Sequence, residues 1–462
     1  MNSITQPPVL LACGSAAGRA LRSLGVAGCS LLLAVSLSAG VAENAARQPV
    51  NGIDAVALKT GVKDVVTLRG SLPAGDSRSP DTNSALADLA AGMLDKGTTR
   101  NDKFAIARRL GDVGATISFS TDSAALNINA KCLRQDLPLV LELIAEQLRS
   151  PAFSPEEFAK LQKQIAGQTQ RAMEDPDFRS GTAFNNAVYP LGHPNRQAPT
   201  LQFIADVAKA TLEEVKAFYA QHYGPAALKL VIVGDVDPAA ARAEIGKVFA
   251  GWTGGSPAPK AAKAGRVDAA PDQTVFMADK ASVSVLWGQA TQLRYADPDT
   301  LPLRVATAAL GSGFTGRLMA NVRDKEGLTY GIYSAVTGDV YADGDFRIGA
   351  QFAPELLEKG LASAKRQLTA WHQQGITAAE LARVKGDLVG TYKLGLSTTG
   401  GMAGAIINTM NRELPLSFID EYGSKVNALT LAQVNGAIKQ HLDPAKMILI
   451  KAGTVPGALP AK

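Results

Sequence analysis

The sequence is poor in the residues from which many catalytic sites are built, because it contains only three cysteines and four histidines among 462 residues. Three cysteines cannot form a disulfide framework, and two of them, Cys13 and Cys29, lie close to the N-terminus. No two histidines have the i, i+3 or i+4 spacing that would place a pair of imidazoles on one helical face. The four are His193, His222, His372 and His441.

Several catalytic signatures are missing as well. Neither C-x-x-C nor G-x-S-x-G occurs, which excludes the common thiol–disulfide and hydrolase-elbow motifs. Gly311-x-Gly313-x-x-Gly316 matches the dinucleotide-binding pattern in letters only. It follows a helical stretch instead of a strand, and no acidic residue stands at the end of the next strand, where it would bind a ribose. We interpret it as a glycine-rich turn between two helices.

Neither sign of charge dominates, since 47 Lys and Arg residues stand against 42 Asp and Glu residues, a net charge of +5. No dense basic stretch follows the N-terminal region, so nucleic acid is a poor candidate for a partner. Hydrophobic residues make up 46% of the chain and charged residues 19%, which excludes a mainly disordered protein. The length suits two or three domains.

The first 42 residues have the pattern of an export signal. Arg19 and Arg22 form a basic segment, residues 24–41 are apolar or small, and Gly40-Val41-Ala42 offers small residues at the two positions that a signal peptidase recognises. An uncleaved membrane anchor is the alternative, although the apolar stretch is short for that role. We therefore expect an exported protein, and the low cysteine content agrees with a bacterial periplasm.

The rest of the chain is an internal repeat. At least eight residues from Thr211 to Val236 recur 219 positions later, from Thr430 to Val455. In both copies an amphipathic helix is followed by a proline turn and an apolar strand, at 228–233 and 447–450. His222 and His441 are equivalent residues at the ends of these helices. We interpret both as scaffold residues, in a place where a cation interacts favourably with the helix dipole.

A second pair of equivalent helices begins 223 positions apart, at the capping boxes Ser154-x-x-Glu157 and Thr377-x-x-Glu380. We therefore expect an α+β fold with two duplicated halves, 46–253 and 273–458, each a mixed sheet covered by helices. Residues 254–272 are rich in Gly, Pro and Ala and are expected to be a linker. Strands are predicted at 116–121, 124–130, 329–337 and 345–352, and helices at 102–110, 137–148, 304–310, 317–324 and 354–371.

One segment has a distinctive order of residues, because Gly316 to Tyr330 carries several charges up to Gly327 and then enters a predicted strand. It resembles the second-half signature of the insulinase/pitrilysin family, the inverted-motif zinc peptidases that include the mitochondrial processing peptidase. That signature has an Arg and, seven residues later, a Tyr in the setting R-x-K-E-G-L-x-Y. The matching residues here are Arg323 and Tyr330, and the resemblance covers nearly all of residues 50–455.

The chain departs from this family where active members bind zinc. Those members carry H-x-x-E-H on a first-half helix, in which two His bind the metal and the Glu acts on the attacking water. Here the two ligand positions are Asp88 and Gly92, and the position of the base is Ala91. The family's third ligand, a Glu, falls near Gln162. We therefore predict no cofactor in this chain and no catalysis by the chain alone.

The resemblance implies a role in a pair of chains. In the paired branch of the family, a zinc-bearing subunit and a degenerate subunit enclose a chamber, and the degenerate subunit supplies the Arg/Tyr pair. By that resemblance this chain is the degenerate partner in a heterodimer that cleaves extended peptides, and Arg323 and Tyr330 contact substrate and transition state. The alternative is a peptide-binding or scaffold protein with no role in proteolysis. The missing ligands disfavour a self-sufficient homodimeric peptidase.

Overall fold

The structure is a computed structural model, and it describes residues 40–257, 260, 263–267 and 271–458. Most of the expected export signal, residues 1–39, lies outside this range. None of the described helices combines the length and apolar character needed to span a membrane.

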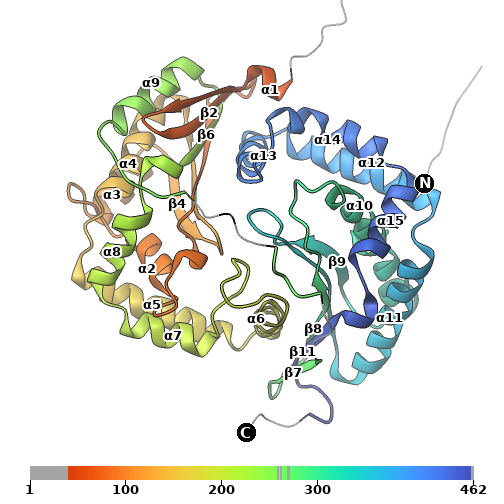
Figure 1. Cartoon of the computed structure of the whole chain (residues 1–462). Coiled ribbons are helices and arrows are strands. Elements are labelled where there is room, and N and C mark those ends of the chain that lie inside the picture. The colour runs from red at the N-terminus through yellow and green to blue at the C-terminus, as the bar shows by residue number, and fades with distance from the viewer. Residues whose placement is uncertain (1–39, 258–259, 261–262, 268–270, 459–462) are drawn as a thin grey trace, which may run out of the picture. The chain divides into compact units, whose positions relative to one another are not determined.

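Two mixed β-sheets form the framework (Figure 1). The strands of the first sheet are β1 (Ala46–Val50), β2 (Ile53–Lys59), β3 (Val65–Leu72), β4 (Thr116–Thr121), β5 (Leu126–Leu133) and β6 (Lys229–Gly234). The strands of the second sheet are β7 (Gln273–Phe276), β8 (Val283–Ala290), β9 (Ile332–Thr337), β10 (Asp345–Phe352) and β11 (Ile448–Gly453).

The strand order shows that the two halves are copies of one unit. The first sheet is ordered β1-β2-β6-β3-β5-β4 and the second β7-β11-β8-β10-β9, so the orders coincide once β1 is set aside. In each sheet one pair is parallel, β2 with β6 and β7 with β11, and the other pairs are antiparallel. The expected α+β fold of two duplicated halves is confirmed.

Helices make up most of the remaining described structure. The first half contains α1 (Val41–Asn44), α2 (Leu86–Met93), α3 (Lys103–Gly111), α4 (Leu137–Arg149), α5 (Pro155–Ala172), α6 (Pro176–Val188), α7 (Thr200–Lys209), α8 (Leu212–His222) and α9 (Pro238–Val248). The second half contains α10 (Thr300–Gly311), α11 (Leu357–Gln374), α12 (Ala378–Gly395), α13 (Thr399–Asn411), α14 (Ser417–Ala428) and α15 (Leu431–His441).

The predicted elements all occur, although some differ in length or type. The strands at 116–121 and 345–352 coincide with β4 and β10. The helix predicted at 317–324 is mainly a π-helix, Met319–Lys325, and the glycine-rich segment before it is a turn, as expected. At α12 the capping box is complete. At α5 only Ser154 caps the helix, because Glu157 pairs instead with Lys103 and Lys160.

A glycine is repeated in both halves because of a close approach between strands. Gly234 and Gly453 end β6 and β11 with positive φ angles of 152° and 136°. A Cβ on either residue would collide with a backbone carbonyl of the neighbouring chain segment, that of Val65 or Ser282. Glycine is therefore required at both copies of the position.

Each sheet is covered on one face by a helix from the other half of the chain. Helix α6 packs on β8 and β11 of the second sheet, whereas α13 packs on β3 and β6 of the first. The first of these interfaces is a buried apolar cluster of Phe184, Ala187, Val188, Tyr189, Leu286, Ala290, Ile448 and Ile450. The second joins Val56, Leu58, Val231 and Val233 to Ala403, Ile406, Ile407 and Met410. Each half therefore depends on the other to bury this second face of its sheet.

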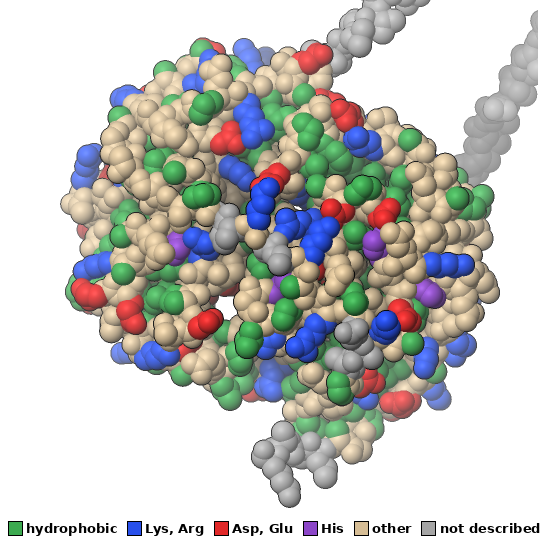
Figure 2. Space-filling model, in the orientation of Figure 1, with side chains coloured by type: hydrophobic (Ala, Val, Ile, Leu, Met, Phe, Trp, Pro, Cys, Tyr) green, Lys and Arg blue, Asp and Glu red, His purple; other side chains and the backbone are tan. Residues whose placement is uncertain are grey.

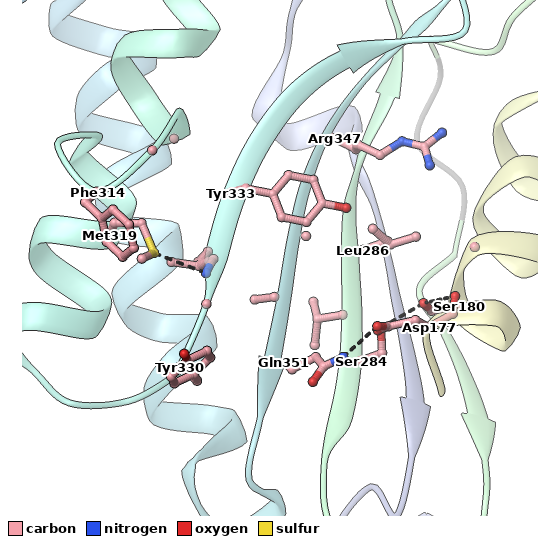
Figure 3. A pocket seen from close by; sticks show the side chains of 18 residues that line it. Asp177, Ser180, Ser284, Leu286, Phe314, Met319, Tyr330, Tyr333, Arg347 and Gln351 are labelled. Carbon is pink, nitrogen blue, oxygen red and sulfur yellow. Dashed lines mark hydrogen bonds between the residues drawn. The ribbon is translucent and has the colours of Figure 1, made fainter. Parts of the chain in front are cut away.

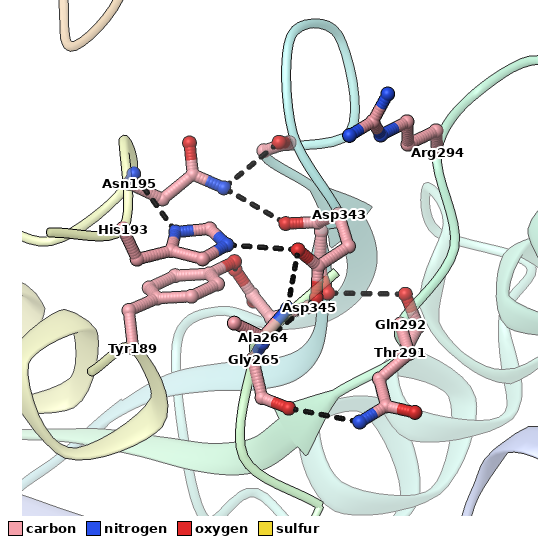
Figure 4. Close-up of polar contacts among 12 residues, drawn as sticks. Tyr189, His193, Asn195, Ala264, Gly265, Thr291, Gln292, Arg294, Asp343 and Asp345 are labelled. Carbon is pink, nitrogen blue, oxygen red and sulfur yellow. Dashed lines mark hydrogen bonds and ion pairs between the residues drawn. The ribbon is translucent and has the colours of Figure 1, made fainter. Parts of the chain in front are cut away.

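A buried polar network fixes the end of α6 against the hairpin between β9 and β10 (Figure 4). Tyr189 Oη donates to Asp345 at 2.6 Å, and His193 Nε2 lies 2.8 Å from Asp343 Oδ1. The linker joins the network, since the Gly265 amide donates to Asp343 at 2.9 Å. Burial raises the pKa of Asp343, but its hydrogen bonds from His193 and the linker amides outweigh burial and hold the pKa below its usual range.

The two equivalent histidines both make contacts within the fold, but their partners differ. His441 Nε2 lies 2.9 Å from Asp299 Oδ2. His222 is buried, and its Nδ1 lies 3.3 Å from both Arg78 Nη2 and Ser256 Oγ. Burial and the neighbouring Arg78 charge lower the pKa of His222 to about 4. The expectation of a cationic His222 is therefore wrong, because this imidazole is neutral at pH 7.

We expect Phe184→Ala to destabilise the protein by about 3–5 kcal/mol, because it leaves a cavity between α6 and the second sheet. Urea unfolding would measure the change. The matched control is Leu191→Ala, which truncates a side chain that is 87% exposed and should change the free energy of unfolding by no more than about 0.5 kcal/mol. A small effect of Phe184→Ala would contradict the packing described for α6.

The neutral His222 predicts a loss of stability in mild acid. Between pH 6.5, the ordinary imidazole pKa, and about pH 4, the unfolded chain binds a proton at this residue that the folded chain does not. The free energy of unfolding should therefore fall as the pH is lowered through this window. In His222→Gln the fall should be shallower than in the original protein. Parallel pH profiles would show that His222 is already charged in the folded state.

Candidate functional site

Arg323 and Tyr330 lie together on the surface of the second half. The Arg323 guanidinium carbon is 5.1 Å from the centre of the Tyr330 ring and 5.1 Å from that of Phe314, which are cation–π distances. Tyr330 is 90% exposed and Phe314 is 70% exposed. The Arg323 side chain forms no hydrogen bond or ion pair with the described residues, so its donors face outward and remain available to a ligand.

Two ion pairs join the segment that carries Arg323 to α11 and α12. Arg317 donates to both carboxylate oxygens of Glu380, at 2.5 and 2.7 Å, and Glu326 accepts from Arg366 at 2.9 Å. Burial raises the pKa of Glu380, but hydrogen bonds from Arg317 and Thr377 lower it to about 2. The charged segment therefore divides into residues that fix its backbone and a pair that is presented to solvent.

A cavity of about 600 Å³ opens beside Tyr330 (Figure 3). The Tyr333 ring points across it from β9 and lies where a side chain at residue 349 would be, so Gly349 on β10 makes room for the ring. Asp177 on the opposite wall accepts from Gln351 at 2.6 Å, and the Arg347 charge is paired with Asp345. The cavity wall is therefore mostly apolar and aromatic, and of its two charged residues Arg347 is paired with a carboxylate, whereas Asp177 accepts from an amide.

A strand at the edge of its sheet lies next to this cavity. Strand β9 pairs with β10 on one side and is the last strand of its sheet. On its outer side the Ile332 amide donates to Met319 Sδ at 3.5 Å and Gly311 lies against the Ser334 amide, so part of the edge remains for an extended peptide to pair with. Strand β4 ends the first sheet in the same way. Both edges suit peptides, and the one at β9 begins two residues after Tyr330.

The positions that replace the zinc ligands lie on α2 and cannot form a zinc site. The Asp88 carboxylate accepts a hydrogen bond from Thr121, and burial raises its pKa. Ala91 is buried in the first core. Gly92 has no side chain, and a Cβ there would lie 2.9 Å from Leu161 Cδ2. Leu161 thus occupies space that a second ligand would need.

The Gln162 side chain holds α5 against α7 by hydrogen bonds. Its Nε2 donates to the carbonyl oxygens of Val207 and Ala210, at 2.7 and 3.0 Å. A carboxylate has no proton for these bonds, so an amide is required. The α5 residue that lines the cavity beside Asp88 is Thr169, two turns later. No group of three or more His, Cys, Asp or Glu side chains able to hold a metal occurs among the described residues.

The cavity beside Asp88 has an unusual carboxylate in its wall. The protein around Asp76 desolvates this side chain, and the charges of Asp88 and Asp122 repel its own, which together raise the pKa of Asp76 to about 8 although part of it faces the cavity. Asp76 and Asp88 therefore form a close pair of buried acids.

Helix α6 separates the two regions. Asp177 and Ser180 line the cavity beside Tyr330, whereas Phe178 and Thr182 line the cavity beside Asp88. The helix is therefore a wall shared by the two cavities, and it lies between the cavity beside Tyr330 and the cavity beside Asp88.

Sequence reasoning found Arg323 and Tyr330 but missed the residues around them. Phe314 lies in the glycine-rich turn and is exposed. An aromatic residue in such a turn could have been noticed in the sequence. Tyr333 occupies an outward position in the alternating strand β9, and this too could have been noticed. Thr169 gave no signal, because its place beside Asp88 depends on how α5 packs.

Two family descriptions match different parts of the chain. Residues 55–194 match "Insulinase (Peptidase family M16)", and residues 209–388 match "Peptidase M16 inactive domain". Together they cover most of the described structure.

Individual proteins are similar over most of their length. An uncharacterized zinc protease of Streptomyces coelicolor is 26% identical over 320 residues, 68% of this chain and 69% of the relative. The non-peptidase homolog YmxG of Helicobacter pylori is 23% identical over 383 residues, 80% of this chain and 84% of the relative. The crystal structure of a peptidase M16 inactive domain from Pseudomonas fluorescens has a TM-score of 0.82 at 24% identity, and the match covers 91% of this chain and 100% of that one.

We expect Gln162→Glu to lower the free energy of unfolding by about 1–3 kcal/mol, because the two carbonyl oxygens on α7 lose their donors. The same change at Gln164, an exposed residue on α5, serves as the matched control and should have little effect. Urea unfolding measures both variants. Equal effects at the two positions would show that Gln162 does not hold α7.

Proposed function

This chain belongs to peptidase family M16, the insulinase family, and we propose that it is a non-catalytic member that supplies Arg323 and Tyr330 to the active site of a zinc-bearing partner. One observation carries the proposal. The Arg323/Tyr330 pair is held together, anchored from behind and exposed beside a cavity and the edge of β9. At the same time, the chain's own metal position is filled by groups that serve packing and hydrogen bonding.

Peptide hydrolysis by this chain alone lacks its chemical requirements. The reaction needs an activated water and a group that polarises the scissile carbonyl, and in zinc peptidases the metal supplies both. Here the position of the base is Ala91, which cannot accept a proton, and Gly92 cannot bind a metal. The proposal therefore places zinc and the attacking water in the partner subunit, and no cofactor in this chain.

The two exposed residues suit the remaining part of the reaction. The Tyr330 hydroxyl donates a hydrogen bond to the oxyanion that develops from the scissile carbonyl, and the Arg323 guanidinium stabilises the same negative charge. Stacking against Phe314 and Tyr330 restricts the Arg323 side chain before substrate arrives. Less reorganisation is then needed when the charge forms.

The proposed substrate is an extended peptide paired with the edge of β9. Main-chain hydrogen bonds would supply most of the affinity, since the edge offers them whatever the peptide's sequence is. The cavity beside Tyr330 would receive one peptide side chain, and its apolar and aromatic wall favours an uncharged one. Selectivity is therefore expected to be loose.

We also propose that the chain is exported to the periplasm. The support is the N-terminal pattern and the described residues that follow it. The amides of Val41 and Ala42 donate to the Asp420 carboxylate at 2.7 and 2.9 Å, and both side chains pack against the apolar cluster that joins β2 and β6 to α13. A cut after Ala42, as the sequence pattern predicts, would remove these contacts. Mass measurement of the secreted protein determines the cleavage site.

A peptide-binding or scaffold role without proteolysis makes a different prediction. In that case the chain would bind peptides or other subunits, but would not change the turnover of any zinc peptidase. A self-sufficient peptidase would hold one zinc per chain and cleave peptides in a chelator-sensitive way. Metal analysis and peptide assays on the purified chain, with and without a zinc-bearing family member, separate the three roles.

We expect Tyr330→Phe to slow peptide cleavage by the mixed subunits about 10²–10³-fold, because one oxyanion donor is lost while the ring stays in contact with Arg323. Steady-state peptide assays measure the rate, and size-exclusion chromatography checks that the subunits still associate.

The matched control is Tyr422→Phe, which removes a tyrosine hydroxyl from α14 of the same half. Its turnover should equal that of the original pair. If Tyr330→Phe and Tyr422→Phe give the same rate, the assigned role of Tyr330 is wrong.

A further inference from the structure

A separate cavity of about 400 Å³ lies where the two halves meet, and its charged lining is unbalanced. The charged residues that line it are four basic and two acidic ones: Arg78, Lys260, Arg294, Arg412, Asp297 and Glu413. Asp297 is already paired with Lys263 at 2.5 Å. Lys and Arg side chains also gather near the middle of the face shown in Figure 2. The cavity therefore carries an excess of positive charge.

Arg412 is the residue whose charge is least compensated. It follows α13, and its guanidinium carbon lies 3.6 Å from the centre of the Tyr295 ring. Its Nε is buried without a hydrogen-bond partner, and the side chain forms no ion pair with any residue that the structure describes. Arg304 contacts the same ring, but it donates three hydrogen bonds to Asp339, at 2.6, 2.7 and 3.2 Å. The two arginines thus differ in that only Arg304 is hydrogen-bonded to Asp339, whose charge also acts on Arg412 from a greater distance.

Arg78 faces the cavity from the first half with neutral partners only. Its Nη2 lies 3.3 Å from His222 Nδ1 and donates to Ser256 Oγ at 3.1 Å, and its Nε is buried without a partner. Burial lowers the pKa of Arg78, as it does that of Arg412. Since His222 is neutral, no anion among these neighbours offsets the Arg78 charge. Partly buried guanidinium groups without a counter-ion are unfavourable unless a ligand supplies one.

We propose that this cavity binds a peptide carboxylate, either the C-terminal carboxylate or the side chain of an Asp or Glu residue. A guanidinium presents two parallel N–H groups that match the two oxygens of a carboxylate. Stacking on Tyr295 holds Arg412 in a fixed plane, and small uncharged residues such as Ala124 and Gly192 leave room for the peptide. The inference rests on the proposed function only in that the ligand is a peptide.

Binding to the full chain without any partner subunit tests this site separately from proteolysis. The probes are three fluorescent ten-residue peptides, otherwise uncharged: one with a free C-terminus, its C-terminal amide, and an amide with one internal Glu. Fluorescence anisotropy gives the affinities. We expect a peptide with a carboxylate to bind at least about tenfold more tightly than the uncharged amide, and comparison of the two carboxylate peptides identifies the source of the group.

Variants assign the effect to the cavity. Arg412→Gln should remove most of the advantage of the carboxylate peptide and leave the uncharged amide unchanged. Lys260→Gln alters an exposed residue of the same cavity, so folding is not at risk, and it should reduce the advantage about threefold. Arg109→Gln, on α3 and paired with Glu142, is the matched control. Tyr330→Phe should keep the full carboxylate preference.

Three results would overturn the site. Equal affinity for the charged and uncharged peptides shows that no carboxylate is recognised. If Arg412→Gln lowers the affinity for the charged and uncharged peptides equally and Lys260→Gln changes neither affinity, Arg412 has only a structural effect. If no probe binds detectably, the ligand of this cavity is not a peptide. Failure of the Tyr330 prediction with a preserved Arg412 effect would instead reject the role in proteolysis and keep this site.

Discussion

The exchange of α6 and α13 between the halves is the packing on which the rest of the structure depends. Each sheet buries one face against a helix that belongs to the other copy of the repeat. The two apolar interfaces therefore form at the same time. Burial of large side chains such as Phe184 is the main source of stability in such interfaces. The polar network of Asp343 and Asp345 then fixes where α6 ends. The halves therefore behave as one folding unit.

The same exchange arranges the functional regions. Because α6 lies on the second sheet, one of its faces lines the cavity beside Tyr330 and another lines the cavity beside Asp88. Because α13 lies on the first sheet, Arg412 at its end lines the same cavity as Arg78 from the first half. A peptide held at β9 and a carboxylate held at Arg412 would thus be bound by different parts of one framework.

The replaced metal position illustrates how a site is lost. Replacing the ligands alone would leave a space in the core lined by polar groups without partners, which is unfavourable. Here Leu161 packs against Gly92, Thr121 satisfies Asp88, and the Gln162 amide serves two carbonyl groups. Each replacement is now part of the packing or hydrogen bonding. Restoring the ligands one at a time would therefore disturb the fold before it restored any chemistry.

The sequence by itself determined the repeat, the strands at 116–121 and 345–352, and the Arg323/Tyr330 spacing. These features follow from local periodicity and backbone conformation, which neighbouring residues encode. Only the tertiary structure decided which helix covers which sheet, that His222 is neutral, and that Arg412 stacks on Tyr295 without a carboxylate. Those features arise between segments far apart in the chain, where burial and the choice of partner set the charge and the hydrogen bonds, and no local pattern records them.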